Sequence, residues 1–131
     1  MFNLEQIDEI HDRFGRADAL LQYLQALKAI GVDKYDTFIT DGHSEYYGEN
    51  DHTVSSPPGH KTLNVAKTGN REKLLEHLDL HKRHQTNYLE MSIGLADSGI
   101  EKWTFDTSNM TISYYDKAGK EMIAEALLEN T

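Results

Sequence analysis

Three histidines, His77, His81 and His84, recur at positions i, i+4 and i+7 of one predicted helix. This spacing places their rings on one stripe of the helix. Two imidazoles at i and i+4 are a known zinc-binding geometry, which a nearby carboxylate could complete. The sequence lacks the His-Glu-x-x-His pattern, however, and Arg83 next to His84 repels a cation. Solvated or capping histidines are therefore the better interpretation, and we expect no metal or other cofactor.

A second polar group lies where this helix gives way to the next one. His81, Gln85, Thr86 and Tyr88 surround the predicted junction, and polar groups at a helix N-terminus can bind an anion or a small polar ligand. With Trp103 they form the candidate ligand site, in a pocket at the interface of two repeats. Capping of the second helix by Thr86 explains that threonine fully without a ligand and is the preferred interpretation.

Aromatic residues are concentrated in the predicted strands. They are Tyr35, Tyr46, Tyr47, Trp103, Phe105, Tyr114 and Tyr115. Aromatic side chains can line a pocket, but cross-strand aromatic pairs also stabilise a sheet without any ligand. Adjacent residues of a strand point to opposite faces, so one tyrosine of Tyr46-Tyr47 and one of Tyr114-Tyr115 are expected on the outer face.

Known catalytic motifs are missing. The chain has no cysteine, which excludes thiolate chemistry and cysteine-ligated metals. It has no Gly-x-Ser-x-Gly and no dinucleotide-binding fingerprint, and Gly59-His60-Lys61-Thr62 lacks the glycines of a phosphate-binding loop. We therefore predict no catalytic residue, and the missing motifs favour a protein that is not an enzyme without deciding the question.

Hydrophobic periodicity and capping residues predict four helices. The first begins at Asn3, with Gln6 completing the cap, and the second ends before Gly31. The third is capped by Asn70 and the fourth by Thr86. Alternating segments predict three strands after each helix pair. These strands lie near 35–39, 45–47, 53–56, 103–105, 111–115 and 122–126, with a short extra strand at 62–65.

The chain repeats itself with an offset of 68 residues. Gly31-Val32-Asp33-Lys34-Tyr35 returns as Gly99-Ile100-Glu101-Lys102-Trp103, and Tyr46-Tyr47 returns as Tyr114-Tyr115. Each glycine fits the left-handed position at which a helix stops, with the apolar pairs Leu27/Val32 and Leu95/Ile100 in contact across the ending. We predict an α+β fold made by internal duplication of a helix-helix-strand-strand-strand unit, with a mainly antiparallel sheet, helices packed on it and a pseudo-twofold relation.

Length and charge bound the remaining possibilities. A chain of 131 residues fits a single domain made of two repeats, about 1–58 and 68–126, joined by a linker at about 57–69. The formal charge of −9 disfavours nucleic acid. No apolar run is long enough for a membrane span, and the N-terminus does not resemble a secretory signal. We expect a cytoplasmic location.

The C-terminal part carries a long recognisable pattern. It comprises Gly99-Ile100-Glu101-Lys102-Trp103, Asp106, Met110-Thr111 and Tyr114-Tyr115-Asp116-Lys117-Ala118-Gly119. Further matching positions are Asp41-Gly42, Tyr46, Leu63-Asn64-Val65, His81 and Gln85-Thr86-Asn87-Tyr88. On these residues the chain resembles the YbcV-like family of prophage-associated proteins, often labelled "phage envelope protein". His84 and Asn87 depart from the pattern, which has a small residue and an aspartate there. The resemblance implies a small phage- or prophage-derived protein and transfers no reaction.

Together these observations predict a non-enzymatic accessory or protein-interaction module. Its partner would be another protein or a second copy of the chain, and not a nucleic acid or a membrane. The alternative is a small-molecule-binding protein that uses the pocket described above. A metal-dependent hydrolase built on the three histidines ranks third.

Overall fold

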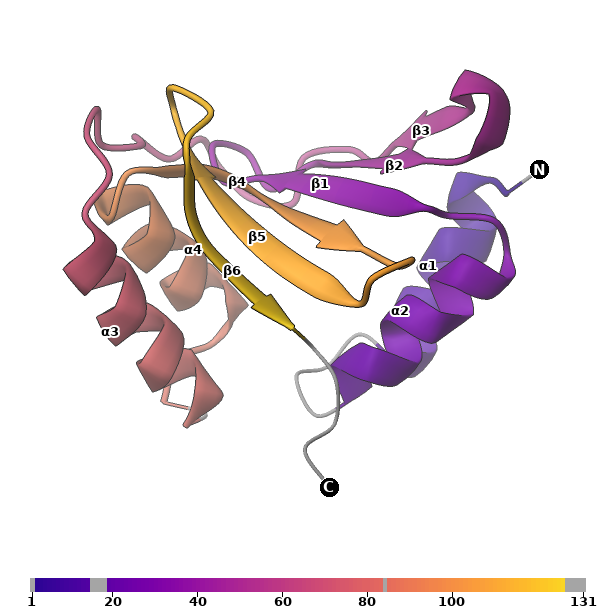
Figure 1. Ribbon diagram of the computed structural model, residues 1–131, viewed down its shortest axis with the longest axis horizontal. Coiled ribbons are helices and arrows are strands. Elements are labelled where there is room, and N and C mark those ends of the chain that lie inside the picture. The colour runs from indigo at the N-terminus through magenta and orange to yellow at the C-terminus, as the bar shows by residue number, and fades with distance from the viewer. Residues whose placement is uncertain (1, 15–18, 84, 127–131) are drawn as a thin grey trace.

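The computed structural model describes residues 2–14, 19–83 and 85–126, and only the backbone of Lys82 and Tyr88. In these residues two helices and three strands are followed by two helices and three strands (Figure 1). The first set is α1 (Leu4–Phe14), α2 (Leu20–Ala29), β1 (Lys34–Phe38), β2 (Ser44–Tyr47) and β3 (Thr53–Ser55), with the short 3-10 turn η2 (Glu49–Asp51) before β3. The second set is α3 (Arg71–Lys82), α4 (Tyr88–Asp97), β4 (Ile100–Asp106), β5 (Thr111–Asp116) and β6 (Glu121–Ala126).

All six strands form one sheet in the order β3-β2-β1-β4-β5-β6, and every neighbouring pair is antiparallel. The predicted α+β class is therefore confirmed. The two halves join edge to edge through β1 and β4. Figure 1 shows both helix pairs on the same side of the sheet, with α1 and α2 at one end and α3 and α4 at the other.

The strand order is symmetric about the β1–β4 contact. In this contact Asp36 pairs with Thr104, and these two residues are themselves separated by the offset of 68. The pairing continues in both directions, from Lys34 with Asp106 to Phe38 with Lys102. The descent of the halves from one duplicated unit stays a prediction, as does the division into repeats and a linker.

The helix endings follow the sequence closely. Gly31 has a φ of 103°, its N–H donates to the carbonyl of Lys28, and the N–H of Val32 donates to the carbonyl of Leu27. These two bonds define the predicted Schellman ending. Gly99 has a φ of 81° at the end of α4, where a residue with a Cβ would be strained.

Most predicted caps are confirmed, but one is wrong. The side chains of Asn3 and Asn70 accept the expected backbone N–H groups. The N-cap of α4 is Asn87 rather than Thr86. Asn87 accepts from the N–H of Glu90 at 2.8 Å, and Glu90 accepts from the N–H of Asn87 at 3.0 Å. This reciprocal pair satisfies two N–H groups, whereas Thr86 would satisfy one.

The expected strand at 62–65 is also wrong. Leu63 donates one backbone hydrogen bond to the carbonyl of Thr40 at 2.7 Å, without a ladder to extend it. Val65 is nevertheless buried. The apolar residues of this segment therefore anchor the connection to the core and do not form a strand.

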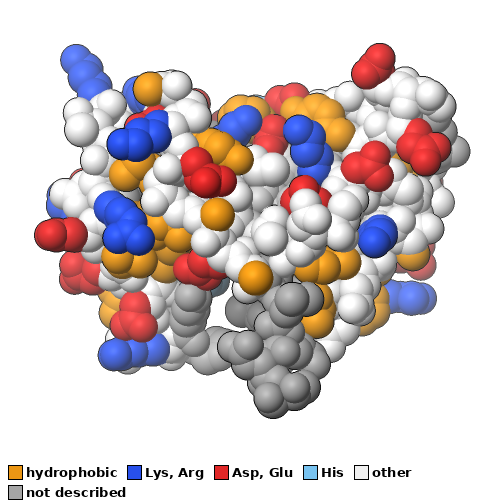
Figure 2. All heavy atoms as spheres, in the orientation of Figure 1, with side chains coloured by type: hydrophobic (Ala, Val, Ile, Leu, Met, Phe, Trp, Pro, Cys, Tyr) orange, Lys and Arg blue, Asp and Glu red, His pale blue; other side chains and the backbone are white. Residues whose placement is uncertain are grey.

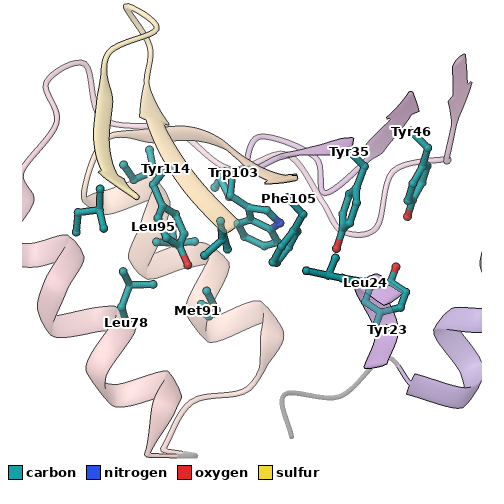
Figure 3. Close-up of a cluster of buried hydrophobic side chains, with 14 of the residues drawn as sticks. Tyr23, Leu24, Tyr35, Tyr46, Leu78, Met91, Leu95, Trp103, Phe105 and Tyr114 are labelled. Atoms are coloured by element: carbon teal, nitrogen blue, oxygen red, sulfur yellow. The ribbon is translucent and has the colours of Figure 1, made fainter. Parts of the chain in front are cut away.

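The buried side chains form one continuous core between the sheet and the helices. Its centre is a row of rings across β2, β1 and β4 (Figure 3). Tyr35 stacks on Tyr46 on one side and on Phe105 on the other, with both centroid distances at 4.9 Å. Trp103 contacts Phe105 edge-on at 6.5 Å. Because this row crosses from one half to the other, the halves share their core.

Within the described residues, no helix has both the length and the apolar character required to cross a bilayer.

Two glycines provide a matched test of the close packing around the start of β4. Gly99 and Gly119 have nearly the same φ, 81° and 82°. A Cβ at Gly99 would overlap the carbonyl oxygen of Thr68 and lie 2.7 Å from Cα of Gly69, whereas a Cβ at Gly119 would meet nothing within 4 Å. Gly119→Ala should lower the free energy of unfolding by roughly 1–2 kcal/mol through backbone strain alone. Gly99→Ala should lower the free energy of unfolding by about 1–3 kcal/mol more than Gly119→Ala does, because its Cβ also overlaps the neighbouring backbone.

Urea denaturation of the two variants and the wild type measures this difference. Equal losses would mean that the segment at 68–69 moves aside without cost, contrary to the packing described here.

Candidate functional site

The described helices leave one face of the sheet uncovered (Figure 1). Side-chain alternation and strand register place one set of residues on this outer face. They are Lys34, Asp36, Phe38, Glu45, Tyr47, Lys102, Thr104, Ser113 and Tyr115. Figure 2 shows hydrophobic, acidic and basic side chains interspersed along this side of the molecule. The outer face is therefore neither an apolar patch nor a uniformly charged surface.

Asp36 lies at the centre of the outer face and is only 6% exposed. Neighbouring side chains, rather than a helix, cover it. Its carboxylate accepts hydrogen bonds from Thr104 Oγ1 at 2.5 Å and Tyr47 OH at 3.2 Å, and it lies 3.5 Å from Lys102 Nζ. A buried carboxylate needs such donors to offset its lost hydration. Strands from both halves supply them.

His43 lies beside this centre, between two carboxylates. Its Nδ1 lies 2.5 Å from Oδ1 of Asp41, and its Nε2 lies 3.0 Å from Oε2 of Glu45. The ring also stacks on Phe38 at a centroid distance of 4.6 Å. Because a carboxylate only accepts, both ring nitrogens must donate, which makes His43 an imidazolium in this arrangement.

The pKa values agree with this geometry. Burial lowers the pKa of His43, but the hydrogen bonds and charges of Asp41 and Glu45 outweigh it and raise the pKa above its ordinary value. Burial raises the pKa of Asp41, but hydrogen bonds from the backbone and ring of His43 outweigh it and lower that pKa. Burial, followed by the charges of Asp36 and Glu45, raises the pKa of Tyr47. Its phenol therefore stays protonated and acts as a donor.

These contacts form a connected network. Tyr47 OH lies 3.2 Å from a carboxylate oxygen of both Glu45 and Asp36, so it links the His43 pair to the centre. His43 has no free lone pair to act as a base, and three donors surround Asp36. Among the described residues, no group of three or more histidine and carboxylate side chains is arranged to hold a metal ion. The contacts therefore hold these polar side chains in fixed positions.

One contact occurs twice on the outer face. Lys34 Nζ lies 5.3 Å from the centroid of the Tyr47 ring, and Lys102 Nζ lies 5.4 Å from that of Tyr115. Both members of the second pair follow those of the first by 68 residues. The two cation–π pairs lie on either side of the Asp36–Thr104 pair. The outer face thus presents the same chemistry from each half.

Comparison with known proteins gives one family match. The model of a family described as "Protein of unknown function (DUF1398)" matches residues 8–126. The chain belongs to this family. No curated protein matches the chain.

In this DUF1398 member, the predicted ligand residues are only partly brought together. His81 Nδ1 lies 3.2 Å from Thr86 Oγ1 at the junction of α3 and α4, and Gln85 is exposed there. Figure 1 shows that this junction lies at the end of the helix pair away from the sheet, whereas Trp103 belongs to β4 and its side chain lies in the core (Figure 3). The Tyr88 side chain lies outside the described residues. A ligand site here stays a prediction.

The histidine stripe is likewise divided among different roles in the DUF1398 chain. The His77 ring packs against Gly94 of α4. The contact is so close that a Cβ atom at Gly94 would lie 2.5 Å from His77 Nδ1. His81 is bonded to Thr86, and His84 lies outside the described residues. A metal site on this stripe stays a prediction.

The outer-face network was not among the sequence-predicted sites. A signal for it exists in β2 and the turn before it, where Asp41, His43, Glu45 and Tyr47 alternate at i, i+2, i+4 and i+6. Such alternation places four polar groups on one face of a strand. It does not reveal Asp36 or Thr104, which join them through strand pairing.

Proton NMR of the His43 ring tests the imidazolium assignment in this DUF1398 protein. Its pKa should exceed the ordinary value of about 6.5. Glu45→Gln should lower it, because one acceptor loses its charge. Glu49→Gln removes an exposed carboxylate that is not bonded to His43 and serves as the control. A pKa unchanged in Glu45→Gln would contradict the bridged geometry.

The same bonds give stability a defined pH dependence. Because the pKa of His43 is raised on folding, its contribution is complete below about pH 6.5 and is lost as pH rises through the raised value. The contribution of Asp41 has the opposite sign and is lost as pH falls through its lowered pKa. Denaturation of wild type and His43→Gln across pH should therefore show a stability difference that shrinks as pH rises through the raised pKa of His43.

Proposed function

We propose that this chain is a non-enzymatic protein-interaction module that binds a partner protein through the outer face of its sheet. The supporting observation is that Phe38, Tyr47 and Tyr115 lie half-buried on a face that no described helix covers. Tyrosine and other aromatic residues are enriched at the centres of protein interfaces, where they combine a large apolar area with a polar tip.

The partner surface is expected to carry arginine or lysine. All three rings already lie within 6 Å of an ammonium group of the chain, since Lys102 Nζ is also 5.9 Å from the centroid of Phe38. Guanidinium groups stack well on such rings. Asp36 and Glu45 are each paired with a cation of the chain, so the attraction of a basic protein comes from the net charge of −9 of the whole chain.

A binding role also agrees with how the polar groups of the outer face are engaged. His43 and Asp36 are held by several partners, which fixes the shape of the surface before binding. Such preorganisation favours affinity because fewer side chains lose freedom on association. A prophage origin, which the sequence resemblance implies, stays a prediction and is independent of this proposal.

Site-specific photo-crosslinking tests the proposed surface. A benzoylphenylalanine residue is placed at Ser113 on the outer face or, as the control, at exposed Glu76 of α3. In cells that contain the natural partners, Ser113 should give a protein adduct of one defined mass and Glu76 should not. Tyr115→Ser should reduce this adduct about tenfold or more, as removal of a central interface tyrosine does, without a large change in melting temperature.

Equal adducts from both positions, or an adduct unaffected by Tyr115→Ser, would contradict the proposal. Native mass spectrometry of the untagged chain supplies an independent result. A stoichiometric small-molecule mass would favour the small-molecule alternative instead.

A further inference from the structure

A groove lies between α1 and α2, away from the outer face of the sheet. It has a volume of about 310 Å³ and is open to solvent. Its floor is apolar and its rim is polar. The lining residues are Gln6, Glu9, Ile10, Arg13, Phe14, Ala26, Ala29 and Ile30.

The side chains of α1 and α2 explain why the two helices leave this groove between them. Ile7 is the fully buried residue of α1, while Ile10 and Phe14 are only partly buried at the margin of the core. The opposite wall carries Ala26 and Ala29, which have too little volume to fill the space between the two helices. The apolar stripe of α1 is thus wider than the core that covers it.

Acidic residues of α1 lie beside the groove, whose own charged lining residues are Glu9 and Arg13. Glu5, Glu9 and Asp12 follow one another at i, i+4 and i+7, so they form one exposed stripe of α1 beside the groove. With Asp8, the helix has four carboxylates and one cationic side chain, Arg13, besides His11. The ion pair between Arg13 and Glu9 spans 3.7 Å with both side chains more than two-thirds exposed, so it is weak and offsets one of the four carboxylates.

We propose that this groove docks a basic amphipathic helix of a partner protein. Apolar side chains of the helix would enter between α1 and α2, and flanking lysine or arginine side chains would contact Glu5, Glu9 and Asp12. The volume is about twice the roughly 150 Å³ that accommodates a benzene molecule, so it has room for two large apolar side chains. Residues at i and i+4 of a helix present such a pair.

Charge and openness select this occupant. A small apolar molecule would leave much of its surface in water, because ligand pockets usually bury most of their ligand. A second copy of the chain would bring a net charge of −9 toward the acidic stripe of α1. A basic helix covers the apolar floor and neutralises the acidic stripe of α1 at the same time. This site shares no residue with the outer face of the sheet and does not rest on its proposed function.

A designed peptide provides the probe. It is a fluorescein-labelled amphipathic helix with leucines at i and i+4 and lysines and arginines on both flanks; the control peptide has glutamates in place of the basic residues. Fluorescence anisotropy should show saturable binding of the basic peptide and at least tenfold weaker binding of the acidic one. Affinity for the basic peptide should fall as salt concentration rises.

Two matched variants locate the site. Ala29→Arg inserts a long cationic side chain into the groove and should weaken basic-peptide binding about tenfold or more. Gln25→Arg adds the same charge at an exposed position of α2 that does not line the groove. It should change the affinity by less than about twofold, because salt screens a charge at this distance. Tyr115→Ser should leave binding unchanged, which separates this site from the outer face.

Three results would overturn the proposal. The first is no saturable binding of the basic peptide, and the second is equal weakening by Ala29→Arg and Gln25→Arg. The third is concentration-dependent self-association of the wild type that Ala29→Arg abolishes, since the occupant would then be a second copy of the chain.

Discussion

The antiparallel pairing of β1 with β4 is the interaction on which the rest of the structure depends. It is the contact that turns two three-stranded sheets into one six-stranded sheet. On the inner side it brings Tyr35 against Phe105, which joins the cores beneath the two helix pairs. On the outer side it brings Thr104 to Asp36. A shift of one residue in this register would exchange the two faces, placing a carboxylate in the core and a phenol ring outside.

Different interactions hold the two faces of the β1–β4 contact. The inner face is fixed by apolar area and ring packing, which tolerate small adjustments. The outer face is fixed by hydrogen bonds to Asp36 and His43, which tolerate little change in distance or angle. Those bonds hold the aromatic rings of the outer face in place without covering them. The result is a surface whose shape is set by polar contacts and whose contact area is supplied by rings.

Capping and alternation rules predicted the features that depend on a few neighbouring residues. The positive φ of Gly31 and Gly99 follows from their place after an apolar helix, and the opposite orientation of Tyr46 and Tyr47 follows from strand alternation. The cap at α4 failed because Thr86 and Asn87 are both capable caps, and the choice depends on the reach of Glu90. In each case the deciding atoms lie within a few residues of one another.

The candidate sites could not be predicted in the same way. The bond from Thr104 to Asp36 depends on the register of strands that are 68 residues apart, which no local pattern specifies. The groove depends on the pairing of two small residues of α2 with a wide apolar stripe of α1, and this becomes apparent only after the helices are packed. The histidine spacing was easy to recognise, yet the described members of the stripe serve helix packing and a junction bond.

The long separation of β1 from β4 has a consequence for the growing chain on the ribosome. After β1 has been synthesised, one of its edges can pair with β2, but the other edge has no partner until β4 follows 68 residues later. At 5–20 residues per second, this takes roughly 3 to 14 s. During that time the nascent chain exposes an unpaired strand edge and the ring of Tyr35. Such surfaces are substrates for chaperones and sites of aggregation. The chain that completes one sheet from two halves must therefore be protected, or fold rapidly once β4 leaves the ribosome.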